Sequence, residues 1–145
     1  MDGSTAQTRR SIGETVLLAG IVMLTGSVTA AEGQNAGATI KPVLSQGLPN
    51  VPGKSLTAVV VTYGPGGKSP PHHHAGSVFA YVLSGSIRSR VSGQGSARVY
   101  KAGEAFFEPP GSEHLISENA SAAEPASLLA VFVADTGARL TVLDH

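Results

Sequence analysis

Three of the five histidines in this 145-residue chain follow one another, as His72-His73-His74. They come after Pro70-Pro71 and before a run rich in β-branched and aromatic residues, which favours a strand. Residues two apart on a strand face the same side, so His72 and His74 can point together while His73 points away. Two imidazoles on one face are a ligand pair that divalent transition metals accept readily.

A third imidazole is available at His114. It follows the turn sequence Pro109-Pro110-Gly111 and begins another short apolar run, so pairing of distant strands can bring it opposite His72 and His74. Taken alone, an H-x-H pair favours a solvated loop tip over a metal site. The fifth histidine, His145, is the last residue, and we expect it at a frayed chain end.

The segments that must position these histidines predict an all-β domain. β-Branched and alternating runs are separated by turn sequences such as Gly64-Pro65-Gly66-Gly67. We expect strands at 55–63, 78–83, 87–91, 97–101, 105–108, 114–117, 128–133 and 140–143. Many short strands at such spacing favour a sandwich or a barrel. Beyond the N-terminal region, no long stretch has the 3.6-residue apolar period of an amphipathic helix.

Residues 1–31 have the layout of a secretory signal peptide. Arg9-Arg10 precedes an apolar segment at 16–24, and small residues follow it up to Ala31. Nine residues fall short of the roughly 20 that span a bilayer, so we expect cleavage, no stable membrane span afterwards, and a periplasmic or secreted protein. The arginine pair is also compatible, as a weaker match, with a twin-arginine signal.

Residues 32–54 form a lead-in between the signal and the expected barrel at 55–145. The segment contains Gly, Asn and Pro and includes Lys41-Pro42-Val43-Leu44. Such a segment is either a loose tail or an edge strand laid along a neighbour.

Composition excludes several classes of protein. Ten Lys and Arg balance ten Asp and Glu, whereas nucleic-acid binders usually carry a basic excess, so no nucleic-acid partner is expected. The absence of cysteine removes disulfides, thiolate metal sites and cysteine nucleophiles. A hydrophobic fraction of 41% is enough for a buried core and argues against intrinsic disorder.

Two motifs in the chain resemble those of the cupin family. Gly67 followed by His72-x-His74 and closing at Tyr81-Val82-Leu83-Ser84-Gly85 is similar to the first motif, and Gly103-x5-Pro109-x-Gly111-x2-His114 matches the second. The resemblance implies a double-stranded β-helix barrel, often a homodimer, with a metal ion inside at one end. Its implied ligands are His72, His74 and His114.

The chain departs from the first motif at one position. The family usually supplies a glutamate seven residues before the closing glycine, where this chain has Val78. The site is then either a working three-histidine centre or a plain binding pocket with weakened metal binding. Glu104, Glu108 or Glu113 is an alternative source of the missing carboxylate. We favour the three-histidine centre, because both sets of motif histidines are intact.

The resemblance implies a metal-dependent, dioxygenase-like enzyme that acts on a small organic substrate. The cofactor is one divalent transition metal, namely iron (Fe), manganese (Mn), nickel (Ni), copper (Cu) or zinc (Zn), since imidazole suits most of these ions. Glu108 and Glu113 are candidate bases. Candidate pocket residues are Phe79, Tyr81, Phe107, Leu115 and Phe132. The alternatives are a non-catalytic cupin that binds a small ligand or a metal, and a metal-dependent isomerase or lyase.

Overall fold

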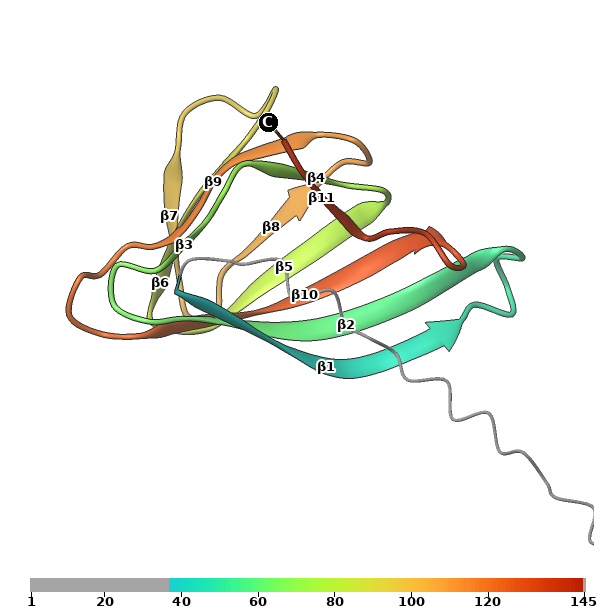
Figure 1. Ribbon diagram of the computed structural model, residues 1–145, viewed down its shortest axis with the longest axis horizontal. Helices are drawn as coiled ribbons and strands as arrows, with labels where there is room; N and C mark the ends of the chain where they lie inside the picture. The colour runs from blue at the N-terminus through green and yellow to red at the C-terminus, as the bar shows by residue number, and fades with distance from the viewer. Residues whose placement is uncertain (1–36, 145) are drawn as a thin grey trace, which may run out of the picture. The chain divides into compact units, whose positions relative to one another are not determined.

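The computed structural model describes residues 37–144. Within this range eleven strands form two antiparallel sheets and no helix is present, as Figure 1 shows. The all-β prediction is confirmed. The signal peptide predicted at residues 1–31 and the frayed end predicted at His145 lie outside the described residues. No helix in the described range is long and apolar enough to cross a membrane.

The first sheet is built from long strands whose residues alternate between its two faces. Its order is β1 (Ala38–Gly47), β2 (Lys54–Tyr63), β10 (Ala126–Asp135), β5 (Ser77–Ser84) and β8 (Ala105–Glu108). In β10 and β5 every second residue is buried, as the period of two in a strand requires. For the lead-in at residues 32–54, the sequence allowed either a loose tail or an edge strand. The lead-in contains β1, which pairs with β2 at the edge of the sheet.

The second sheet brings together short strands that are far apart in the sequence. Its order is β11 (Thr141–Leu143), β4 (His72–His74), β9 (Glu113–Asn119), β6 (Ser86–Val91) and β7 (Arg98–Lys101), with β3 (Lys68–Ser69) also paired to β9. In this sheet β4 lies between β9 and β11, and His72 is the direct register partner of His114.

The core lies between the two sheets. Its fully buried aliphatic side chains are Val78 and Val82 of β5 and Ile87 of β6. Burying each such side chain contributes about 1.5–3 kcal/mol. Around them pack Tyr63, Phe106, Leu128 and Phe132 together with small residues. The two sheets therefore share one core.

Two glycines of the motifs are explained by close approach of the backbone. A Cβ atom at Gly67 would lie 2.5 Å from the carbonyl oxygen of Gly37. At Gly85 it would lie 2.7 Å from the carbonyl oxygen of Pro125, and φ there is +68°, a region that favours glycine. Both positions therefore exclude any other residue without a shift of the backbone.

Asn119 at the end of β9 holds a loop in place. Its buried amide donates to the carbonyl oxygens of Gly64 (3.0 Å) and Glu124 (2.7 Å). Its side-chain oxygen accepts from the backbone N–H of Ser121 at 2.9 Å. The asparagine that follows the second motif thus links the loop after β9 to the turn after β2.

Candidate metal centre

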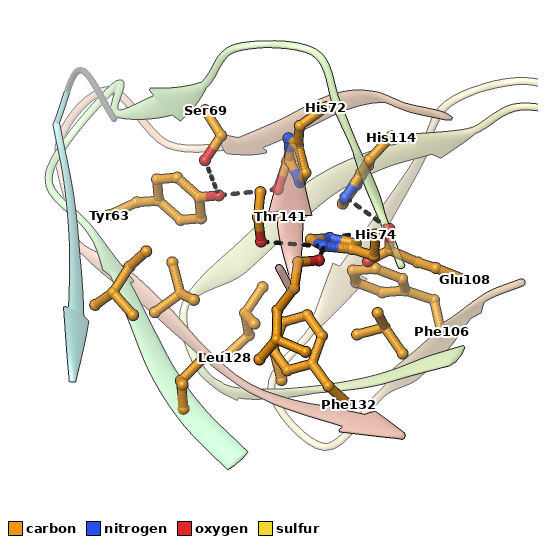
Figure 2. A pocket seen from close by; sticks show the side chains of 17 residues that line it. Tyr63, Ser69, His72, His74, Phe106, Glu108, His114, Leu128, Phe132 and Thr141 are labelled. Carbon is orange, nitrogen blue, oxygen red and sulfur yellow. Dashed lines mark hydrogen bonds and ion pairs between the residues drawn. The ribbon is translucent and has the colours of Figure 1, made fainter. Parts of the chain in front are cut away.

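The three motif histidines gather at one place inside the barrel. His72 and His74 come from alternate positions of β4, and His114 comes from the neighbouring strand β9. All three are buried, with 7%, 6% and 3% of their surface exposed. One ligand atom from each lies within 4.8 Å of the others, and Figure 2 shows the three rings converging. The prediction that His72 and His74 point together and meet His114 is confirmed.

Backbone carbonyls fix the orientation of two of the rings. His72 Nδ1 lies 2.8 Å from the carbonyl oxygen of Pro70, and His74 Nδ1 lies 3.0 Å from that of Leu140. A carbonyl oxygen only accepts hydrogen bonds, so in both rings Nδ1–H is the donor. The Nε2 atoms are then left with free lone pairs, the form in which imidazole binds a metal.

The third ring is held by a hydroxyl group. His114 Nε2 lies 2.8 Å from Ser89 Oγ, and both atoms are buried. When this nitrogen donates to the hydroxyl oxygen, Nδ1 of His114 presents its lone pair to the other two rings. Ser89 is therefore a positioning residue for His114.

Burial favours the neutral form of His72 and His74. Desolvation lowers the pKa of His72 to about 4, although its hydrogen bond to Pro70 acts in the opposite direction. Desolvation also lowers the pKa of His74. Since protons and metal ions compete for the same nitrogen lone pairs, these lowered values leave the rings available as ligands at neutral pH.

A carboxylate lies against the histidines. Glu108 is 3% exposed, and its Oε2 is 3.1 Å from His114 Nδ1 and 3.6 Å from His74 Nε2. Burial alone raises the pKa of Glu108, but contact with His114 and the charges of the imidazoles outweigh it and lower the pKa. The pKa of Glu108 is therefore lowered in spite of its burial, which favours the carboxylate form.

The rings and the carboxylate close one end of a cavity of about 200 Å³. Ile40, Val59, Val61, Val78, Phe106, Leu128, Ala130, Phe132 and Leu140 give it an apolar lining, and Tyr63, Ser69, Ser117 and Thr141 add hydroxyl groups. The Tyr63 hydroxyl is hydrogen-bonded to Ser69 at 2.8 Å and to Ser117 at 2.9 Å. Apart from this cluster and the metal centre, the cavity is apolar.

The residues present fit a divalent cation. Imidazole nitrogens of three histidines and a buried carboxylate oxygen face one another, and no hydrogen bond of good geometry reaches Glu108 Oε2 from a described residue. Uncompensated, such an arrangement is repulsive in a low-dielectric interior. A single divalent ion would turn these contacts into attractive ones. His72, His74 and His114 would hold it.

The C-terminal strand β11 braces the ligand strand. It pairs with β4, and Thr141 Oγ1 lies 3.2 Å from His74 Nδ1. On the side of β4 that faces away from the centre, the His73 ring is 2.5 Å from a carboxylate oxygen of Asp144. The position of His74 therefore depends on residues 140–144.

Three aromatic residues predicted to line the pocket do not line it. Phe79 and Tyr81 in β5 and Phe107 in β8 are 46%, 38% and 49% exposed and lie on the outer face of the first sheet. Strand alternation explains the error, because Val78 and Phe106 occupy the inward positions. Phe132 does line the cavity, as predicted.

Leu115 and Glu113 also lie away from the cavity. Leu115 borders a separate depression with Lys68, Pro70 and Pro71. Glu113 is the strand-register partner of His73. Leu115 and Glu113 are both absent from the cavity lining. Of the two acids predicted as bases, only Glu108 lies in the cavity. Sequence reasoning missed Tyr63, Phe106 and Leu128, although alternation along their strands could have identified Phe106.

The chain belongs to the cupin family. The family model described as a cupin domain matches residues 59–132, just over half of the chain, and both histidine motifs lie inside that range. No curated protein matches the chain.

Solved structures of similar fold include enzymes. A cupin-2 domain protein from Rhodospirillum rubrum is 19% identical with a TM-score of 0.57, and the match covers 76% of this chain and 67% of that one. Oxalate oxidase in complex with the substrate analogue glycolate is 22% identical with a TM-score of 0.58, over 77% and 57% of the two chains. Bacillus subtilis oxalate decarboxylase is 29% identical with a TM-score of 0.51, over 61% of this chain but only 23% of its own length. The chain thus spans about a quarter of that decarboxylase.

The lowered pKa of His72 predicts that the metal-free protein loses stability on mild acidification. Below its ordinary value of 6.5 the unfolded chain takes up a proton at His72, whereas the folded protein does so only near pH 4. Urea unfolding titrations with a chelator present should show that the free energy of unfolding falls by about 2 kcal/mol between pH 7 and pH 5 because of His72. The His72→Gln variant should lack this part of the pH dependence, and His73→Gln should keep it. Equal pH dependence in wild type and His72→Gln would contradict the prediction.

Proposed function

We propose that the protein binds one divalent transition metal ion through His72, His74 and His114 and is a metal-dependent enzyme of dioxygenase-like type. The observation that carries the proposal is the convergence of three buried imidazole rings and one buried carboxylate at one end of an apolar cavity. Three histidine ligands leave coordination positions open for substrate.

The rest of the cavity supports chemistry on a small organic molecule. The bound metal would supply a Lewis acid and a site at which oxygen is activated. Around it the apolar side chains of Val78, Phe106 and Phe132 exclude water. The Tyr63 hydroxyl, oriented by Ser69 and Ser117, is placed to hydrogen-bond a polar group of the substrate.

The cavity size and the structural neighbours both support a small substrate. A volume of about 200 Å³ is below the roughly 300–1,000 Å³ of sites for drug-sized ligands. Similar folds occur in oxalate oxidase, seen with glycolate, and in oxalate decarboxylase. We therefore propose a compact, oxygen-rich organic substrate.

The proposal predicts that metal binding depends on both histidine strands. Protein purified without a polyhistidine tag should contain one metal ion per chain, measured by elemental mass spectrometry. His72→Ala and His114→Ala should both lose it, and His73→Ala should retain it, because His73 lies on the opposite side of β4. Retention of metal in both ligand variants would end the proposal.

Activity is tested on the metal-loaded protein. A panel of small carboxylic acids, phenols and diketones is assayed for oxygen uptake and for product by mass spectrometry, with and without oxygen. Product formed with oxygen consumption supports the dioxygenase-like activity, whereas product formed without oxygen identifies an isomerase or lyase.

A non-catalytic binding cupin is the second candidate. Two observations favour it. The cavity hydroxyls of Tyr63, Ser69 and Ser117 are hydrogen-bonded to one another. Among the described residues that line the cavity, Glu108 alone carries a carboxylate. In that case a panel ligand raises the melting temperature of the metal-loaded protein and no product forms.

We also propose that the protein is exported, on the basis of the signal-like pattern in residues 1–31. The prediction is that the mature protein begins near Ala30 or Ala31. N-terminal sequencing of protein recovered from the periplasm or the medium tests it, and a mature chain that still begins at Met1 would contradict it.

We further propose that the protein forms a homodimer through the outer face of the first sheet. Phe79, Tyr81, Leu83, Phe107 and Val133 are all exposed there, and the rings of Phe79 and Tyr81 stack at a centroid distance of 6.4 Å. Apolar patches of this kind usually mark interfaces. The partner is a second copy, because the apolar side chains of this face can pack against the same side chains of another copy, and its charged residues Lys54 and Asp135 pair with each other at 2.6 Å.

The second sheet provides the contrast and the control. Its outer face carries charged residues, with Arg88 and Glu118 3.6 Å apart. Sedimentation velocity should give the mass of two chains for the wild type and for Arg90→Glu, and the mass of one chain for Phe79→Glu. A monomeric wild type would contradict the proposal.

A further inference from the structure

A metal site of three histidines alone does not explain why the Glu108 carboxylate is buried beside them. The carboxylate is buried, and no hydrogen bond of good geometry reaches Oε2 from a described residue, although His114 Nδ1 lies 3.1 Å away. A buried polar atom without a partner costs about 1–3 kcal/mol, and more when it is charged. The position of this oxygen therefore needs a positive charge beside it.

Ring nitrogens of two of the three histidines lie close to Oε2. It lies 3.1 Å from His114 Nδ1 and 3.6 Å from His74 Nε2, and Figure 2 shows it beside both rings. The Leu140 carbonyl holds the His74 proton on Nδ1, so the Nε2 lone pair faces the carboxylate. A cation bound by both atoms would turn this contact from a repulsive one into an attractive one.

The strand register gives this carboxylate a definite place. Glu108 in β8 is the direct antiparallel partner of Val78 in β5, and both side chains point into the interior. The Cβ atoms of such partners are about 4.5–5.5 Å apart. A carboxylate on Glu108 therefore reaches the same side of the cavity as a longer side chain at position 78 would.

We propose that Glu108 is a fourth protein ligand of the metal ion, supplied from the strand next to Val78. The inference rests on the proposed function, in which the three histidines bind the ion. A general base must face the substrate, whereas Oε2 faces the ligand nitrogens. One carboxylate among the ligands also reduces the net charge of a divalent centre from +2 to +1, which weakens its attraction for anions.

The first test is the affinity of the full chain for Mn²⁺ and Zn²⁺, measured by calorimetry on metal-free protein. Glu108→Gln keeps the shape of the side chain and one oxygen but removes its charge, and it should weaken binding by at least about tenfold. The matched control is Glu113→Gln, which removes a carboxylate beside His114 but outside the cavity. It should bind like the wild type. Wild-type affinity in Glu108→Gln would overturn the inference.

The second test moves the carboxylate across the strand pair. The double variant Val78→Glu/Glu108→Val should recover most of the affinity that Glu108→Val alone loses. A folded double variant that binds no better than Glu108→Val would overturn the inference. Should the swap fail to fold, Glu108→Gln decides.

Infrared difference spectra separate a ligand from a positioning residue. On addition of Mn²⁺ the carboxylate stretching bands of the wild type should shift, and Glu108→Gln should lack that shift. A wild-type spectrum without the shift would overturn the inference, because Glu108 would then act only through His114. Loss of metal in His72→Ala tests the proposed function separately, so the two failures are distinguishable.

Discussion

The centre depends on the register of two strand pairs. β4 lies beside β9 with His72 opposite His114, and β5 lies beside β8 with Val78 opposite Glu108. A slip of one residue in either pair would turn a histidine or the Glu108 carboxylate outward, since successive side chains alternate between faces. The buried aliphatic residues on the same inward positions, such as Val78 and Ile87, oppose that slip. Hydrophobic burial therefore fixes the geometry of the polar site.

The same alternation gives the two sheets different outer surfaces. The first sheet presents Phe79, Tyr81 and Phe107 outward, whereas the second presents Arg88, Arg90 and Glu118. The inner faces of both sheets pack against the same core, so the two sheets differ in the residues of their outer faces. One barrel thus combines a closed interior for a small molecule, a charged side and an apolar side.

Local pattern was enough to predict part of this structure. The turn sequences and β-branched runs placed the strands, and the period of two placed His72 and His74 on one side. Local pattern could not place His114, because β4 and β9 are separated by some forty residues and their pairing follows from the folded topology. The family resemblance supplied that residue. The aromatic residues misled the choice of pocket, since Phe79 and Phe107 are as apolar as Phe106 and the first sheet is apolar on both faces. Applying alternation from Val78 would have turned Phe79 outward.

The bracing of His74 by residues 140–144 has a consequence for biosynthesis. The Leu140 carbonyl that sets the tautomer of His74, and the Asp144 carboxylate beside His73, are the last parts of the described chain to leave the ribosome. A nascent polypeptide that already contains both histidine motifs still lacks the strand that orients its second ligand. A chain cut before residue 140 would keep all three motif histidines, yet its His74 would lose the carbonyl that orients the ring.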